Sequence, residues 1–94
     1  MNNSQFDTLI HAPNRLKICA LLASAASMEF VVLKEQLEVS DSVLSKHIKS
    51  LEDAGYVLLD KKALNGRQRT WLSLSKDGHK AFSGHVKALK EIVG

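Results

Sequence analysis

Residues 40–74 read SDSVLSKHIKSLEDAGYVLLDKKALNGRQRTWLSL and begin with a pattern typical of a capped amphipathic helix. Ser40 can accept a hydrogen bond from an unpaired N–H of the first turn, where Asp41 adds a negative charge, and Gly55 suits a left-handed helix end. One face is apolar: Leu44, Ile48, Leu51 and Ala54. The opposite face is mostly hydroxyl-bearing or basic: Ser42, Ser45, Lys46, Lys49 and Asp53. This pattern predicts a helix over 40–54 with a polar outer face.

The rest of this stretch predicts a β-hairpin. Two β-type runs, 57–63 and 69–74, flank Asn65-Gly66, which is a strong signal for a two-residue turn. With that turn, aliphatic residues pair on one face of the ribbon: Leu59 with Leu72 and Val57 with Leu74. The outer end is basic, and only Asp60 offers a nearby carboxylate to its cations: Lys61, Lys62, Arg67 and Arg69.

Two further helices are expected ahead of this stretch. Pro13 suits the first turn of a helix over 13–25, and the apolar residues of that helix form two stripes. We therefore expect it to be covered on both sides, by the domain's own core and by a second subunit that contacts Ile18 and Leu22. Over 30–37, apolar residues with i, i+3, i+7 spacing predict a short amphipathic helix: Phe30, Leu33 and Leu37.

A last helix is expected over 76–93, capped by Ser75. Its apolar residues repeat at intervals of 4, 3 and 4 and form one narrow seam: Phe82, Val86, Leu89 and Val93. Such a seam is typical of a helix that packs against another helix. We expect this seam, with Ile18 and Leu22, to form a dimer interface.

Length and composition describe one small globular domain of 94 residues with a net charge of +3. Its one cysteine, Cys19, excludes an intrachain disulfide framework. The sequence contains no phosphate-binding glycine loop, strained nucleophile turn or strand-end carboxylate pair, so we expect no enzyme. It shows no secretory pattern and no apolar stretch long enough to cross a bilayer, so we expect a cytoplasmic protein.

Metal binding is not expected. His79 and His85 are six residues apart and cannot share a helix face as an i, i+4 ligand pair would. We expect His47 at the edge of the core, and Cys19 as a small buried side chain rather than a redox switch. No metal and no other cofactor is predicted.

The predicted elements occur in the order of a winged helix-turn-helix, and the chain resembles the MarR/ArsR-like winged-helix transcriptional regulators of bacteria and archaea. Five motifs carry the resemblance: HAPNRL at 11–16, LSKHI at 44–48, LEDAGYV at 51–57, RTW at 69–71 and LSKDG at 74–78. It covers about residues 9–93. It implies a mainly α fold with a small β-hairpin, in a single 1–94 domain whose helix over 76–93 dimerises.

The resemblance also implies a site for double-stranded DNA, with the helix over 40–54 in the major groove and the hairpin as the wing. On the helix, the positions that match DNA-contacting ones are Asp41, Ser42, Ser45, Lys46 and Lys49. On the wing they are Lys61, Lys62, Arg67, Gln68 and Arg69. A homodimer would place its two recognition helices roughly 34–36 Å apart, which predicts an inverted-repeat operator.

The expected function is therefore sequence-specific DNA binding by a homodimeric transcriptional repressor. One alternative is a protein-interaction winged helix that binds little or no nucleic acid; steep loss of DNA affinity with salt distinguishes the two. Another is a ligand- or redox-responsive sensor of the same fold, with a cavity near Cys19, Phe6 and the last helix.

Overall fold

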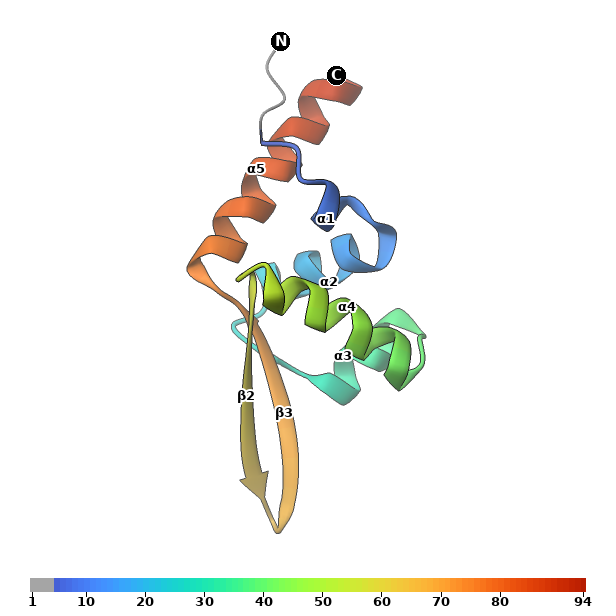
Figure 1. The fold of residues 1–94 in the computed structure, drawn as a ribbon, viewed down its shortest axis with the longest axis vertical. Coiled ribbons are helices and arrows are strands. Elements are labelled where there is room, and N and C mark those ends of the chain that lie inside the picture. The colour runs from blue at the N-terminus through green and yellow to red at the C-terminus, as the bar shows by residue number, and fades with distance from the viewer. Residues whose placement is uncertain (1–4) are drawn as a thin grey trace.

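The structure is a computed structural model that describes residues 5–94. The first four residues of the predicted 1–94 domain lie outside the described residues. Its elements are α1 (Thr8–His11), α2 (Pro13–Ser24), β1 (Met28–Glu29), α3 (Phe30–Leu37), α4 (Asp41–Asp53), β2 (Val57–Leu64), β3 (Arg67–Leu74) and α5 (Lys76–Val93). The molecule measures 53 × 25 × 21 Å, with the β2–β3 hairpin at one end and the last turns of α5 at the other (Figure 1). The predicted mainly helical fold with a small β-hairpin is confirmed. Within residues 5–94, no helix has the length and apolar character needed to cross a membrane.

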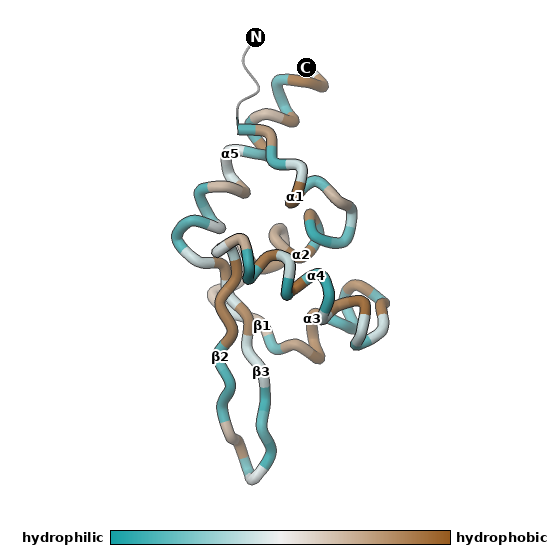
Figure 2. Tube along the Cα trace, in the orientation of Figure 1, coloured by the Kyte–Doolittle hydropathy of each residue, from teal (hydrophilic) through white to brown (hydrophobic). Residues whose placement is uncertain are grey.

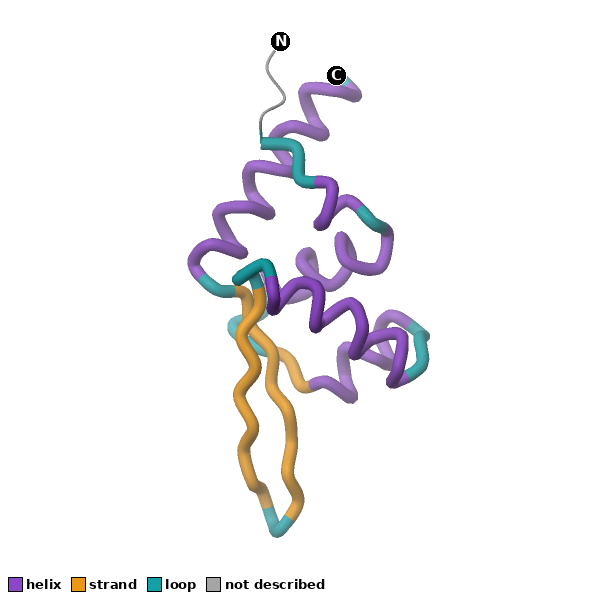
Figure 3. The backbone as a smooth tube through the Cα atoms, in the orientation of Figure 1, coloured by secondary structure: helices purple, strands orange, loops and turns teal. Residues whose placement is uncertain are grey.

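The sheet is antiparallel, with strand order β1-β3-β2 (Figure 3). The predicted hairpin register is confirmed, since Val57 lies opposite Leu74 and Leu59 opposite Leu72. Asn65 and Gly66 have φ values of 52° and 77°, the left-handed conformation that a tight two-residue hairpin turn requires. Strand β1 was not predicted, because two residues are too short to show an alternating pattern.

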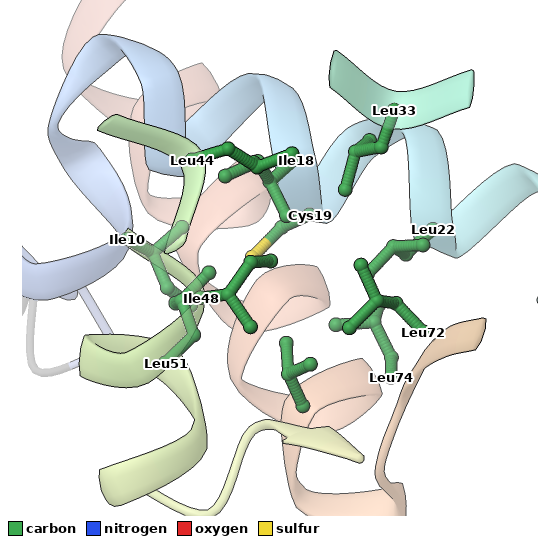
Figure 4. Packing of buried hydrophobic residues seen from close by; sticks show 11 residues of the cluster. Ile10, Ile18, Cys19, Leu22, Leu33, Leu44, Ile48, Leu51, Leu72 and Leu74 are labelled. Carbon is green, nitrogen blue, oxygen red and sulfur yellow. The ribbon is translucent and has the colours of Figure 1, made fainter. Parts of the chain in front are cut away.

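The hydrophobic core surrounds α2. Figure 4 shows its buried side chains converging on one another: Ile10 from α1, Ile18, Cys19 and Leu22 from α2, Leu33 from α3, Leu44, Ile48 and Leu51 from α4, and Leu72 and Leu74 from β3. Val57 of β2 completes the cluster. Helix α2 contacts α1, α3, α4, α5 and β3. The domain's own elements therefore bury Ile18, Cys19 and Leu22 of this helix, whereas Ala20 and Ala23 stay exposed.

This packing corrects one expectation. Ile18 and Leu22 were predicted to contact a second subunit, but both are fully buried within the single chain. The stripe that holds Ile18 and Leu22 therefore belongs to the core of the single chain rather than to a contact between subunits. Neither residue remains available for a dimer interface.

Both predicted helix caps are present. Ser40 Oγ accepts a hydrogen bond from the backbone N of Val43 at 3.2 Å, which caps α4. Ser75 Oγ accepts one from the backbone N of Gly78 at 2.9 Å, which caps α5. Gly55, with φ of 82°, lies just beyond the end of α4 as predicted.

Helix α5 packs on the body through residues that the sequence pattern did not single out. Its buried residues are Gly78, His85 and Ala88. The predicted apolar seam (Phe82, Val86, Leu89 and Val93) lies beside this contact: Phe82 packs partly on the core, Val86 and Leu89 are half-buried, and Val93 is 80% exposed. The seam thus retains uncovered apolar surface in the single chain.

Candidate nucleic-acid interface

All five predicted positions on α4 are exposed: Asp41, Ser42, Ser45, Lys46 and Lys49. They are exposed because the apolar residues of α4 occupy the opposite face, where Leu44, Ile48 and Leu51 enter the core. The polar face of this helix is therefore free to meet a partner along most of its length.

Two of these side chains have ionic partners within the protein. The carboxylate of Asp41 lies 2.8 Å from Lys34 Nζ of α3, and the Lys49 ammonium lies 3.2 Å from Asp53, one turn further along α4. Exposed pairs of this kind contribute about 0–1 kcal/mol, so Lys49 can exchange Asp53 for a phosphate at little cost. Asp41 instead links the first turn of α4 to α3.

The hairpin carries the second group of predicted positions. Its outer part is mainly hydrophilic (Figure 2), and Lys61, Lys62, Arg67 and Gln68 are exposed. Lys62 Nζ lies 3.5 Å from an Asp60 carboxylate oxygen. The outer part of the hairpin therefore presents an excess of positive charge to its surroundings.

Arg69 differs from the other hairpin cations. Asp60 was expected to be the only carboxylate near them, but Arg69 Nη1 lies 3.1 Å from Glu29 of β1. This ion pair forms because β1 adds to the edge of β3 and places Glu29 opposite Trp71, two residues along the strand. The Glu29 side chain is only 15% exposed, so Arg69 joins the hairpin to β1 rather than pointing freely outward.

A groove of about 340 Å³ lies between α4 and the hairpin. It brings together three predicted residues, Ser45 and Lys49 from α4 and Lys61 from β2. Its remaining lining residues are Phe30, Ile48, Glu52, Leu59 and Thr70. Glu52 and Thr70 were missed by the sequence analysis, although Thr70 could have been found from the register, which places it opposite Lys61.

Other predicted residues gather away from this groove. Arg67, Gln68 and Arg69 line a second hollow, of about 260 Å³, together with Glu29 and Val31. Asp41, Ser42, Lys46 and Lys62 line neither of these two hollows. Six of the ten predicted positions thus line one of the two hollows, three between α4 and the hairpin and three on β3 beside Glu29 and Val31.

His47 holds α4 against the body of the domain. It is half-buried, and its Nδ1 lies 3.2 Å from Nη1 of Arg15 in α2. Because a guanidinium can only donate, the imidazole is the acceptor and is neutral. Burial, followed by the positive charges of Arg15 and Lys46, lowers the pKa of His47 below 6.5.

Cys19 is fully buried in the core, as expected for a small packing side chain. Burial, and then the negative charge of Asp7, raise the pKa of its thiol to about 11. The reactive form of a cysteine is the thiolate, so this environment disfavours the redox-switch alternative.

Comparison with known proteins gives a family-level match over most of the chain. A family model described as "Winged helix DNA-binding domain" matches residues 14–93. An uncharacterised protein from Methanocaldococcus jannaschii is 35% identical over 78 residues, which make up 83% of this chain and 85% of that protein.

Solved structures agree in fold. The structure of a transcriptional regulator homologue from Pyrococcus horikoshii OT3 has a TM-score of 0.84 and 25% identity, over 90% of this chain and 84% of that one. NadR in complex with 4-hydroxyphenylacetate has a TM-score of 0.74 and 24% identity, over 97% of this chain and 72% of that one. PcaV from Streptomyces coelicolor has a TM-score of 0.78 at 14% identity, over 96% and 62% of the two chains. The last two likenesses concern the fold alone.

Proposed function

The chain belongs to the winged helix DNA-binding domain family, and from this premise we propose that it is a homodimeric transcriptional repressor that binds an inverted repeat in duplex DNA. The observation that carries the proposal is the groove between α4 and the hairpin. The groove joins an exposed face of α4, which carries basic and hydroxyl side chains, to a basic β-ribbon. Basic and hydroxyl side chains are the groups that bind DNA phosphates and base edges.

In this proposal α4 enters the major groove. An α-helix fits that groove, where each base pair presents a distinct set of donors and acceptors. Ser42, Ser45 and Lys46 are exposed on the N-terminal half of α4, and we assign base contacts to them. Lys49, one turn further along the helix, is assigned to the phosphate backbone, where it would leave Asp53 for a phosphate.

The hairpin supplies phosphate or minor-groove contacts. Lys61 lines the groove beside α4, whereas Arg67 and Gln68 lie next to the turn at the far end of the molecule (Figure 1). The exposed Arg67 is assigned to the phosphate backbone that borders the minor groove, a contact that does not depend on base sequence. Arg69 is assigned a supporting role, because its guanidinium is held by Glu29.

Dimerisation is assigned to the apolar seam of α5. The seam residues keep exposed apolar surface in the single chain, and the C-terminal part of α5 extends beyond the rest of the molecule (Figure 1). A second copy that packs along this seam would cover that surface and double the number of recognition helices. Two-fold symmetry in the protein then calls for an inverted repeat in the DNA. We infer repression because a dimer seated on a promoter would exclude polymerase from the same DNA.

The experiment that tests the function is the recovery of genomic duplex fragments by the purified protein at low and moderate salt, followed by sequencing. We expect an inverted repeat to be enriched and the affinity to fall steeply with salt, by a slope of about 0.9 per phosphate contact, because each contact releases counterions. Absence of retained DNA at low salt would contradict the proposal and favour the protein-docking alternative.

Arg67→Ala is expected to weaken binding to all duplexes with little effect on the fold, because Arg67 is exposed and lies outside the core. Loss of one phosphate contact should lower the salt slope by about 1. Fluorescence anisotropy over a salt series measures both quantities. Lys87→Ala is the matched control: it also removes one exposed cation, on α5 and away from the hairpin. Equal effects of the two variants would remove the wing assignment.

A further inference from the structure

Two histidines tie the N-terminal residues of the described chain to α5. We call residues 5–7 the N-terminal strap; it runs past α5, where the side chain of Gln5 lies against Gly84. The backbone N of Asp7 donates to Nδ1 of His85 at 2.9 Å, and Nε2 of His85 lies 3.2 Å from Nδ1 of His11 in α1. The ring of Phe6 packs on both imidazoles, with centroid distances of 4.9 Å to His11 and 4.7 Å to His85.

These contacts determine where the protons are. Because the Asp7 N–H donates to Nδ1 of His85, that nitrogen carries no proton, and the proton of the neutral ring is on Nε2. Nε2 then donates to Nδ1 of His11, which must also be unprotonated. The arrangement therefore requires both rings to be neutral.

A proton added to the His85 ring breaks the bond to the strap. It would be carried by Nδ1 and would place an N–H against the N–H of Asp7. His85 is fully buried, so no water replaces the lost partner. Burial, followed by the positive charge that His11 carries when protonated, lowers the pKa of His85 below 6.5, although Asp7 acts in the opposite direction.

The charged and titratable neighbours come from every element around the pair. Asp7 accepts hydrogen bonds from the Tyr56 hydroxyl at 2.6 Å and from the Ile10 backbone at 3.0 Å, so its carboxylate is already engaged by α1 and by the residue that precedes β2. Cys19 of α2 is a buried thiol beside Asp7, and Asp77 and Lys80 of α5 line the adjoining hollow. The hydrogen bonds of Asp7 to Tyr56 and Ile10 do not involve α5, so they can survive when the bond from its backbone N–H to His85 is lost.

We propose that His85 is a pH-sensitive switch: uptake of a proton by its buried ring displaces the backbone N–H of Asp7 and releases the N-terminal strap from α5. The pKa of His85 is lower in the folded chain than in the unfolded chain. As the pH falls through 6.5, the unfolded chain therefore binds more protons than the folded chain does. The stabilisation by His85 is therefore complete above pH 6.5 and is lost as the pH falls from 6.5 toward the folded-state pKa. This switch does not depend on DNA binding.

NMR of the full chain between pH 7.5 and 5 tests the proposal. At pH 7.5 we expect His85 as the neutral Nε2–H tautomer. Below pH 6.5 the hydrogen exchange of the Asp7 amide, corrected for intrinsic rates, should accelerate by about tenfold per pH unit, because the open state alone takes up the proton. A proton on Nδ1 of His85 at pH 7.5, or protection of Asp7 that does not change with pH, would overturn the proposal.

His85→Asn supplies the matched variant. Its amide oxygen can take the place of Nδ1 as the acceptor for Asp7 without titrating, so protection of the Asp7 amide should become independent of pH. His79→Asn is the control on the same helix, because His79 is exposed and should leave the wild-type pH profile unchanged. Persistence of the wild-type pH dependence in folded His85→Asn would also contradict the proposal. If that variant does not fold, the wild-type tautomer and exchange measurements still test it.

Discussion

Leu89→Asp is expected to convert the proposed dimer into monomers and to weaken binding to the proposed inverted repeat by about 10²–10⁴-fold, the range that a second linked binding event contributes. Leu89 lies at the centre of the apolar seam of α5, between Val86 and Val93. A carboxylate there would be buried without a partner in the proposed dimer, which costs several kcal/mol. Light scattering measures the mass, and fluorescence anisotropy measures the affinity.

Ser83→Asp is the control for this prediction. Ser83 is exposed on the same helix but off the seam, and the substitution adds the same charge. It should leave both the mass and the affinity near wild type. A dimer that survives Leu89→Asp would place the interface elsewhere than on α5. Monomers with undiminished affinity would show that one domain is sufficient for binding.

Gly78→Ala is expected to cost about 3 kcal/mol of stability or more, at the upper end for an overpacked site. A Cβ at Gly78 would lie 2.1 Å from the carbonyl oxygen of Tyr56, a backbone atom that also accepts a hydrogen bond from the Ser75 N–H at 2.9 Å. That oxygen cannot withdraw without breaking the junction between the sheet and α5. The free energy of unfolding of a whole domain is about 5–15 kcal/mol, so this loss is a large fraction of it. Urea unfolding at one protein concentration measures the change.

Gly84→Ala is the matched control for Gly78→Ala, because both glycines lie in α5. At Gly84 a Cβ would meet the Gln5 side chain at 3.2 Å, and an exposed side chain can move aside. Alanine is better than glycine in a helix by about 1 kcal/mol, so we expect this variant to stay within about 1 kcal/mol of wild type. Equal losses at the two positions would contradict the steric explanation.

The elements of the candidate site could be predicted from the sequence because their signals are local. Ser40 and Gly55 mark the ends of α4 through hydrogen bonds and dihedral angles within a few residues. Asn65-Gly66 determines the register of the hairpin through the turn itself. The same local pattern placed the polar face of α4 outward, as the exposed side chains show.

Contacts between distant residues could not be predicted in this way. Glu29 is forty residues from Arg69 and reaches it only because a two-residue strand joins the sheet. Arg15 is hydrogen-bonded to His47, and Asp7 to His85, because helices far apart in the sequence pack together. No sequence pattern links the residues of either pair. Ile18 and Leu22 formed an apolar stripe like that of an interface, but only the packed domain shows how many neighbours cover α2.

The sequence by itself determined the order of the main helices and the hairpin, the hairpin register, and the ends and the polar and apolar faces of α4, because caps, turns and periodicity act over a few residues. Tertiary structure decided which apolar stripes stay within the chain and which cations have carboxylate partners. It also brought the rings of His11 and His85 into contact beside the N-terminal strap. These outcomes depend on which residues from distant parts of the chain approach within a few ångströms, and local patterns carry no information about such distances.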